Sequence, residues 1–335
     1  MKKALNILYL AIGLTVFMYV LLFLSPFENA IYLIDSGAYD YSIRTSKGYS
    51  AESDYYENKI EDIVIIDIDE RSLAKNRLGR FASWPHHEYY AEVIKNISRD
   101  NPKVIAFDII IDEDKDPEKN KILDDAVKNS GKVVSALYFE NANPDKYIEK
   151  DLEEPKGYDY EKDSYNVPGL EVSPIHQYDH LSNPNIELYN NSLGTGAVLF
   201  TPDDDGVIRR LVPFYQYLDR FYPFLGIQMF AKANNVDQFE MIGNDTLVMK
   251  SEQESIRRIP LKDGNIFISY TGEIDKFRRI SFYSILRNNN YQQLEPGFFK
   301  DKYVIIGASA AGLFDLRVTP VQETFPGVGI HANIL

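Results

Sequence analysis

The chain has 335 residues and no cysteine, which excludes disulfides, thiolate catalysis and cysteine-ligated metal sites. Its formal net charge is −14 at pH 7, so the surface repels phosphate backbones and we expect no nucleic-acid partner. A hydrophobic fraction of 44% is ordinary for a globular protein with a sizeable core.

The first predicted element is a membrane anchor. Residues 5–24 carry no charged side chain, and at ~1.5 Å per residue such a run crosses roughly 30 Å of hydrocarbon. Lys2 and Lys3 precede it, which favours a cytoplasmic N-terminus and export of the rest. The alternative is a cleaved signal peptide, but such peptides have apolar cores of about 7–15 residues and a small-x-small cleavage site. We therefore predict an N-terminal transmembrane helix over 1–26, with 27–335 as an extracytoplasmic domain.

Helical spacing continues beyond the anchor, and the residues that carry it are Phe27, Ala30, Ile31, Ile34, Ala38 and Tyr41. We expect a helix that leaves the membrane and docks one face on the exported domain. An amphipathic helix on the lipid surface is the weaker alternative, because basic residues are few here.

Apolar runs then alternate with helical patterns. We expect strands at 63–69, 104–109 and 133–137, with helices at 86–99 and 122–129 between them. Continuous apolar runs are typical of strands buried on both faces. The alternation predicts an α/β fold in which a mostly parallel central sheet has helices on both faces.

The segment at about 141–190 is different, because it is polar, acidic and rich in Tyr and Pro. We interpret it as an insertion with little core of its own. Regular structure is expected again from Gly194 onward. The strands expected there are 197–200, 207–217, 246–249, 266–270 and 302–307, the helices 224–234 and 281–287, and a turn lies at 201–206. Residues 331–335 have the character of a helix start.

Acidic side chains follow two of the buried strands, which we expect to be adjacent in the sheet. Asp67 and Asp69 end the first strand, and Asp108 ends the second. Ligands of open α/β sheets bind at the carboxyl ends of the strands. Clustered carboxylates there can hold Mg²⁺ or Ca²⁺, or one can act as a general base. The structural alternative is that Asp69 caps the following turn of helix and Asp108 pairs with a loop amide or a base.

Other motifs add candidate ligand contacts. The loop 307–312 presents Gly307 and Ser309, whose backbone can cradle an anion, although the loop lacks the Lys-Ser/Thr of a phosphate-binding loop. Asp315 and Arg317 fit a structural ion pair or a polar ligand at the same edge. Arg209 follows the acidic turn, and alternation predicts that it and Arg210 face opposite sides, one toward a core-edge Asp and the other toward water.

We therefore predict ligand contacts at Asp67, Asp69, Asp108, Arg209, Gly307, Ser309, Asp315 and Arg317, with no catalytic residue, metal or cofactor. The Asp-Asp-Asp-Gly turn at 203–206 has the composition of a calcium loop but not its ligand spacing. His176 and His180 are four residues apart in a Pro-rich stretch that need not be helical, so they do not predict a zinc site. Ser309 lies in no G-x-S-x-G elbow.

A series of segments, in order along the whole chain, resembles CHASE2 domains, the extracytoplasmic sensor modules of bacterial transmembrane receptors. The segments are AYDYSIR at 38–44, IVIIDIDERSL at 63–73, WP at 84–85 with PKVIAFD at 102–108, GAVLFTPDDDGVIRR at 196–210, VIIGASAAGLFDLRVTP at 304–320 and PGVGIHAN at 326–333. One departure is that the family often has an Arg shortly after the Trp-Pro pair, where this chain has His86, His87 and Glu88.

The resemblance implies a sensory input region that is not itself an enzyme. It implies a membrane-bound receptor that detects a small-molecule or protein signal and signals as a homodimer. Further transmembrane helices and a cytoplasmic output module, such as an adenylate cyclase or a kinase, are expected after Leu335. Two alternatives stay open: an exported metal-dependent hydrolase using Asp67, Asp69 and Asp108, and an envelope assembly module whose 141–190 segment contacts another protein.

Overall fold

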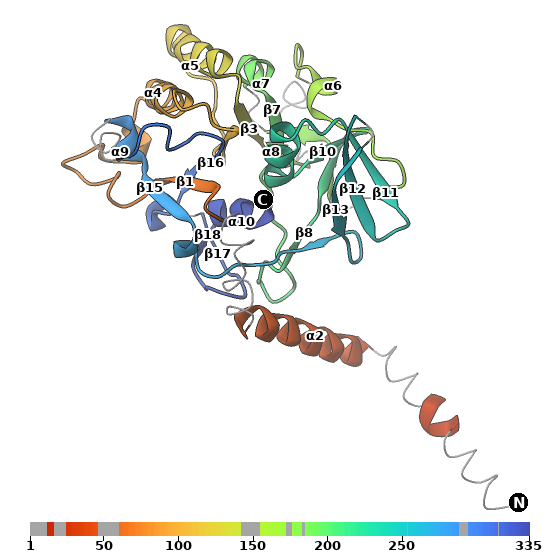
Figure 1. The fold of residues 1–335 in the computed structure, drawn as a ribbon. Helices are drawn as coiled ribbons and strands as arrows, with labels where there is room; N and C mark the ends of the chain where they lie inside the picture. The colour runs from red at the N-terminus through yellow and green to blue at the C-terminus, as the bar shows by residue number, and fades with distance from the viewer. Residues whose placement is uncertain are drawn as a thin grey trace, which may run out of the picture. The chain divides into compact units, whose positions relative to one another are not determined.

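A computed structural model describes residues 12–16, 25–45, 60–141, 155–171, 176–182, 185–252, 254–287, 294–313 and 315–335 (Figure 1). The chain divides into two compact units, 1–49 and 50–335. Apart from 12–16, the predicted anchor at 5–24 lies outside the described residues. Among those that are described, no helix is both long and apolar enough to cross a bilayer.

The smaller unit contains helix α2, Ser25–Thr45, which confirms the helix predicted to continue beyond the anchor. Several of its large apolar side chains are exposed, among them Leu33, Ile34 and Tyr41. The predicted docking of this helix on the exported domain stays a prediction.

The larger unit is built on a six-stranded sheet in the order β15-β1-β16-β2-β3-β7, and every neighbouring pair is parallel (Figure 1). The strands are β1 (Ile63–Ile68), β2 (Val104–Phe107), β3 (Val133–Leu137), β7 (Gly194–Ala197), β15 (Arg278–Ser281) and β16 (Tyr303–Ala308). The α/β class and the parallel central sheet are therefore confirmed. The expected adjacency of the first two strands was wrong, because β16 lies between β1 and β2.

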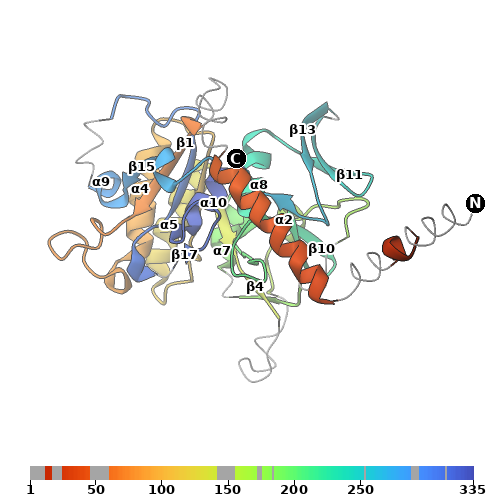
Figure 2. The same ribbon diagram turned by 90° about the horizontal axis from the view of Figure 1, so that it is seen from below.

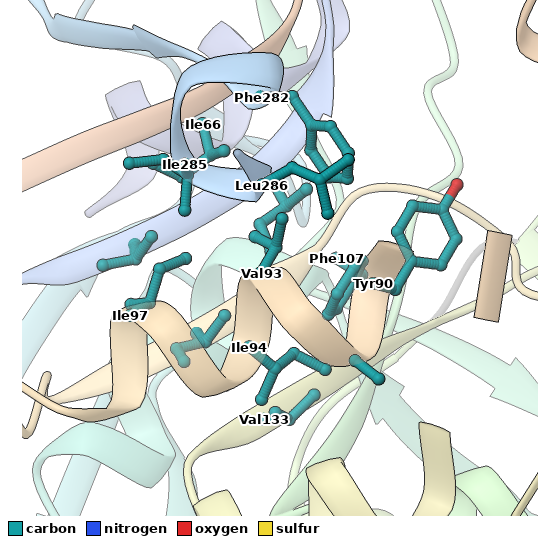
Figure 3. Packing of buried hydrophobic residues seen from close by; sticks show 14 of the residues in the cluster. Ile66, Tyr90, Val93, Ile94, Ile97, Phe107, Val133, Phe282, Ile285 and Leu286 are labelled. Atoms are coloured by element: carbon teal, nitrogen blue, oxygen red, sulfur yellow. The ribbon is translucent and has the colours of Figure 1, made fainter. Parts of the chain in front are cut away.

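Helices cover both faces of this sheet. On one face lie α4 (His86–Ser98), α5 (Pro117–Ser130) and α9 (Phe282–Leu286), whose apolar side chains join Ile66 and Phe107 in one core cluster. Figure 3 shows the side chains of α4 and α9 that belong to it. On the other face lie α8 (Leu225–Ala233) and α10 (Gly327–Ile334), which contact β7, β2, β3, β16 and β1. Figures 1 and 2 both show α4 and α9 side by side, away from α8.

Local sequence explains where α5 begins and ends. The side chain of Asp116 caps the helix by accepting from the Glu118 amide, and Pro117 occupies the first turn. Gly131 ends it in the left-handed conformation, with φ of 59°. The helix ends one residue after the predicted end at 129 and begins five residues before the predicted start at 122, because the cap and the proline favour the earlier start.

Smaller sheets, antiparallel except for the parallel pair of β5 and β9, form much of the rest of the larger unit. Strands β9 (Phe214–Tyr217) and β10 (Arg220–Pro223) form a hairpin, to which β5 (Gln177–Tyr178) adds. A second sheet consists of β11 (Gln238–Ile242), β12 (Thr246–Ser251) and β13 (Glu254–Pro260). Strand β8 (Arg210–Leu211) pairs with β14 (Ile266–Phe267), and β17 (Leu316–Arg317) pairs with β18 (Phe325–Pro326). The single strand predicted at 207–217 is thus divided near Pro213, which has no amide to donate.

The described parts of the 141–190 segment contribute to the core more than its polar composition suggests. They contain α6 (Tyr160–Asp163), β5, β6 (His180–Leu181) and the start of α7 (Ile186–Asn191), and β6 pairs with β4 (Phe139–Glu140). Tyr158 and Tyr189 are buried, as are Leu181 and Leu188. Tyrosine rings bury a large apolar area despite their polar hydroxyl group, which explains the difference.

Candidate functional site

One row of residues crosses the carboxyl ends of three neighbouring strands. Asp67 of β1 is paired in register with Gly307 of β16. Asp108 follows β2, and its amide continues the ladder by donating to the Ile306 carbonyl at 2.8 Å. A Cβ atom added at Gly307 would lie 3.4 Å from the Asp108 Cβ atom. Asp67 and Asp108 therefore flank Gly307 on one face of the sheet, at the edge where the sequence places the candidate site.

Gly307 allows α10 to lie against this row. An added Cβ atom would come within 2.6 Å of Val328, which belongs to α10. Any side chain larger than hydrogen would displace the helix. The glycine predicted to serve an anion cradle thus has a packing function in the described structure.

The Asp67 cluster, consisting of Asp67, Ser309 and Arg279, is closed by internal contacts. Asp67 is only 3% exposed. Its carboxylate accepts from the Ser309 amide at 3.1 Å and from the Ser309 hydroxyl at 2.8 Å. Arg279 of β15 forms an ion pair with it at 3.2 Å. Burial nevertheless raises the pKa of Asp67, which shows that desolvation outweighs these partners.

Asp69 caps the turn after β1, as the structural alternative predicts. Its Oδ1 atom accepts from the Ser72 amide at 2.8 Å and from the Ser281 hydroxyl at 2.8 Å. The neighbouring 307–312 loop is also used internally, because the Ala310 amide donates to the Ile68 carbonyl and the Ala311 amide donates to Glu70. The amides of Ser309, Ala310 and Ala311 therefore all donate to acceptors within the chain.

A second group, the Asp108 cluster, consists of Asp108, His331, Asp315 and Arg317. His331 is the fifth residue of α10 and is 0% exposed. Its Nε2 atom lies 3.2 Å from Asp108 Oδ1, so Asp108 pairs with a base as the structural alternative requires. The imidazole ring stacks on Phe224 with centroids 4.5 Å apart. The expected ion pair between Arg317 and Asp315 is confirmed at 3.1 Å.

Asp315 holds the start of α10. Its carboxylate packs so closely on Gly327 that an added Cβ atom there would clash with both oxygens. Its backbone carbonyl accepts from the Gly327 amide at 2.9 Å. Burial, and then the charge of Asp108, raise the pKa of Asp315 to about 7. Two carboxyl groups thus contact α10, one at its first residue and one at His331.

The Asp108 cluster has hydrogen-bonding capacity that the chain does not use. Among the residues that the structure describes, Asp108 Oδ2, His331 Nδ1 and Arg317 Nε are buried and have no hydrogen-bond partner. Each buried polar atom without a partner costs about 1–3 kcal/mol, so such groups are usually satisfied by water or a ligand. Sequence reasoning missed His331, although a histidine in the largely apolar 326–334 segment is a usable signal.

Arg209 lies apart from these clusters, and the prediction for it was wrong in part. Arg209 is buried and binds Asp203 at 3.1 Å and Asp205 at 2.7 Å. Arg210 binds the other oxygen of Asp203 at 2.7 Å, so both arginines converge on one turn. Strict alternation does not apply because Arg209 precedes β8. The turn itself is confirmed, with Gly206 donating to the Asp203 carbonyl at 2.8 Å.

A cavity of about 360 Å³ lies beside this turn, and the sequence did not indicate it. Its walls come from the 201–204 turn, the 210–215 segment of β8 and β9, the 263–265 tip, and Leu170, Glu171 and His176. These segments are far apart in sequence, so no local pattern could join them. Elsewhere too, the part of the chain that the structure describes holds no group of three His, Asp or Glu side chains able to bind a metal ion.

Comparison with protein families gives one match. A family model described as "CHASE2 domain" matches residues 11–335, nearly the entire chain. Comparison with curated proteins gives no match, and neither does comparison with solved structures.

Proposed function

This chain belongs to the CHASE2 family of sensor domains, and on that premise we propose that it is the extracytoplasmic input region of a bacterial transmembrane receptor. Residues 1–26 anchor it in the cell membrane, and the α/β domain lies outside the cytoplasm. Its partners are the membrane, a small-molecule or protein signal, and a second copy of the chain. The output is a cytoplasmic module such as an adenylate cyclase or a kinase.

The observation that carries this proposal is the burial of His331 against Asp108. His331 belongs to α10, the last helix of the chain, and Asp108 belongs to the strand-end edge where α/β folds bind ligands. A change in charge or hydrogen bonding at this edge therefore acts directly on α10. In the receptors that this chain resembles, the polypeptide continues from here into the membrane.

The packing of α10 suits it to transmit such a change. Gly226 of α8 lies against it so closely that an added Cβ atom would be 3.1 Å from Ile334. Gly307 brings it still closer to β16, because an added Cβ atom there would be 2.6 Å from Val328. Closely packed elements move between discrete arrangements rather than deforming gradually. A signal with different affinities for two such arrangements would shift their populations, which is what a receptor requires.

The first experiment is an immunoblot of native membranes with an antibody to the 60–335 domain. We expect a band well above the 38.5 kDa of this chain, because an output module follows it. Protease added to intact spheroplasts should cut the domain without lysis. A band near 38.5 kDa, or protection from the protease, would contradict the receptor.

The second experiment tests coupling through Asp108. In native membranes we would measure the output activity of Asp108→Asn and of a control, Asp125→Asn, which removes an exposed carboxylate of α5. Asp108→Asn should fix the output at one level, because it removes the charge facing His331. The control should respond like the wild type. Equal behaviour of the two variants would exclude the Asp108 cluster as the coupling element.

The geometry does not favour the hydrolase alternative. Asp67 and Asp69 are bound to serine and arginine side chains within the chain. Asp108 instead faces His331 on the far side of Gly307.

A further inference from the structure

We propose that the cavity beside the Asp203 turn binds a small organic cation, an ammonium or guanidinium group on a short apolar body. The inference that this ligand is the signal of the receptor rests on the proposed function. Its binding to the cavity can be measured independently. At about 360 Å³ the cavity is within the range of sites for small molecules and too small for a folded partner.

Negative charge dominates the lining. Four carboxylates line the cavity, from Glu171, Asp203, Asp204 and Asp263, against one cationic side chain, Arg210. Arg210 is already bound to Asp203 at 2.7 Å, and Arg209 binds the other oxygen of Asp203 at 3.1 Å from behind. Asp203 is thus neutralised internally.

The other three carboxylates differ from Asp203. Among the residues that the structure describes, Glu171, Asp204 and Asp263 form no ion pair, and all three are exposed. They surround the cavity from three separate segments. A cation is attracted to this arrangement and an anion is repelled.

His176 supplies an independent indication of a ligand. Its side chain is 5% exposed and lines the cavity, and no described residue forms a hydrogen bond with its buried Nδ1 atom. Burial lowers the pKa of His176, so the imidazole is neutral at neutral pH and one ring nitrogen can accept a hydrogen bond. An ammonium or guanidinium donor matches this acceptor, whereas a protonated histidine would have repelled it.

The remaining wall is apolar and rigid. Val212, Pro213 and Phe214 line it together with Tyr215. The Tyr215 hydroxyl donates to the Leu199 carbonyl at 2.5 Å, which fixes the ring, and His176 meets that ring edge-on at 5.9 Å. An aliphatic or aromatic body can pack on these side chains while its cationic end faces the carboxylates.

The cavity is also connected to α10. Thr201 lines it, and the preceding residue, Phe200, contacts the His331 ring with centroids 5.3 Å apart. The Arg317 guanidinium lies over the same Phe200 ring at 5.7 Å. A ligand that fixes the 201–204 turn therefore acts, through one residue, on two members of the Asp108 cluster.

The test is calorimetric titration of the full chain in nanodiscs with phenethylamine and agmatine. The matched neutral probe is 2-phenylethanol, and the matched anion is 3-phenylpropionate. We expect saturable binding of the two cations only, weakening as salt is raised because the attraction is partly screened. Glu171→Gln and Asp204→Asn should each weaken binding about ten-fold. The control is Asp219→Asn, whose carboxylate is 85% exposed outside the cavity and whose removal should leave affinity unchanged.

The outcomes separate this inference from the proposed function. Equal binding of the amine and the alcohol, or affinity unaffected by Glu171→Gln and Asp204→Asn, would overturn the cation site and leave the receptor untouched. If Asp204→Asn weakens the binding of the two cations, the cation site is established. Hydrogen exchange of α10 in the same samples then tests the receptor separately: slower exchange with ligand supports signalling through α10, and unchanged exchange counts against that coupling alone.

Discussion

The Asp67 and Asp108 clusters occupy equivalent places on the sheet and differ in how fully their polar groups are used. Asp67 has an arginine and a serine that satisfy both of its oxygens. Asp108 shares one oxygen with His331, and its other oxygen is buried and has no hydrogen-bond partner in the described part of the chain. A saturated cluster has one favoured arrangement, whereas an unsaturated one can gain a proton, a water or a ligand. The comparison therefore separates the part of the edge that holds the fold from the part that can change.

The largest expected effect comes from Asp67→Ala. This change removes the buried acceptor of the Ser309 amide and hydroxyl and one of the two carboxylates that bind Arg279, and we expect a loss of about 3 kcal/mol in the free energy of unfolding. Urea unfolding would measure it, with Asp125→Ala as the exposed control, for which we expect less than about 0.5 kcal/mol. A loss below about 1 kcal/mol would show that Asp67 does not hold the sheet edge together.

Gly307→Ala is expected to be next in size, at about 2 kcal/mol, because its Cβ atom would meet Val328 and force α10 outward. Gly312→Ala is the matched control in the same loop, because an added Cβ atom there has no neighbour within 4 Å. Both are measured by thermal unfolding. If the two variants have the same melting temperature, the contact between α10 and the sheet is looser than described.

The pH dependence of stability should reveal Asp315. Its pKa is raised from 3.8 to about 7, so the folded state binds a proton more tightly than the unfolded state does. Stability from this group is present below about pH 4, decreases between about pH 4 and 7, and is constant above that. Because the side chain is 25% exposed and paired with Arg317, we expect about 1 kcal/mol rather than the full linkage value.

The measurement is urea unfolding at about pH 5 and about pH 8 for wild type and Asp315→Asn. The variant should show a smaller decrease in stability with rising pH. Asp124→Asn is the positive control: the pKa of Asp124 is also raised, to about 6, so this variant too should show a smaller decrease. A profile for Asp315→Asn that parallels the wild type would rule out Asp315 as a titrating group in this range.

The smallest effect on stability should come from Asp108→Asn, which keeps the shape of the side chain and removes its charge. We expect a change below about 1 kcal/mol in the free energy of unfolding, together with a change in the hydrogen exchange of α10 amides. The opposite pattern, a large loss of stability with unchanged exchange in α10, would make the two clusters alike and remove the basis of the comparison.

Sequence patterns predicted the fold best where apolar runs decide the structure. The strand at 133–137 agrees with β3 at both ends, and the run from Ile63 gives β1 within one residue. The order of strands depends on pairing between distant segments, which is why the position of β16 between β1 and β2 was missed. The cavity was missed for the same reason.

For individual site residues too, contacts between sequence neighbours were predicted and contacts between distant residues were missed. The cap formed by Asp69 and the ion pair between Asp315 and Arg317 depend on neighbours in sequence, and both were anticipated as structural alternatives. The pairing of Asp108 with His331 joins residues 223 positions apart. Only the fold brings these two together, and the buried surroundings that raise the pKa of Asp315 also arise from the fold.

The close packing of α10 has a consequence for how the output of such a receptor would depend on the concentration of its ligand. At Gly226 and at Gly307 there is no room even for a methyl group between the helix and α8 or β16 unless something moves. Small perturbations are absorbed without displacement, and a larger one must lift the helix out of contact as a unit. The response of each molecule is then close to a threshold, and intermediate outputs of a cell reflect the fraction of receptors switched rather than helices partly moved.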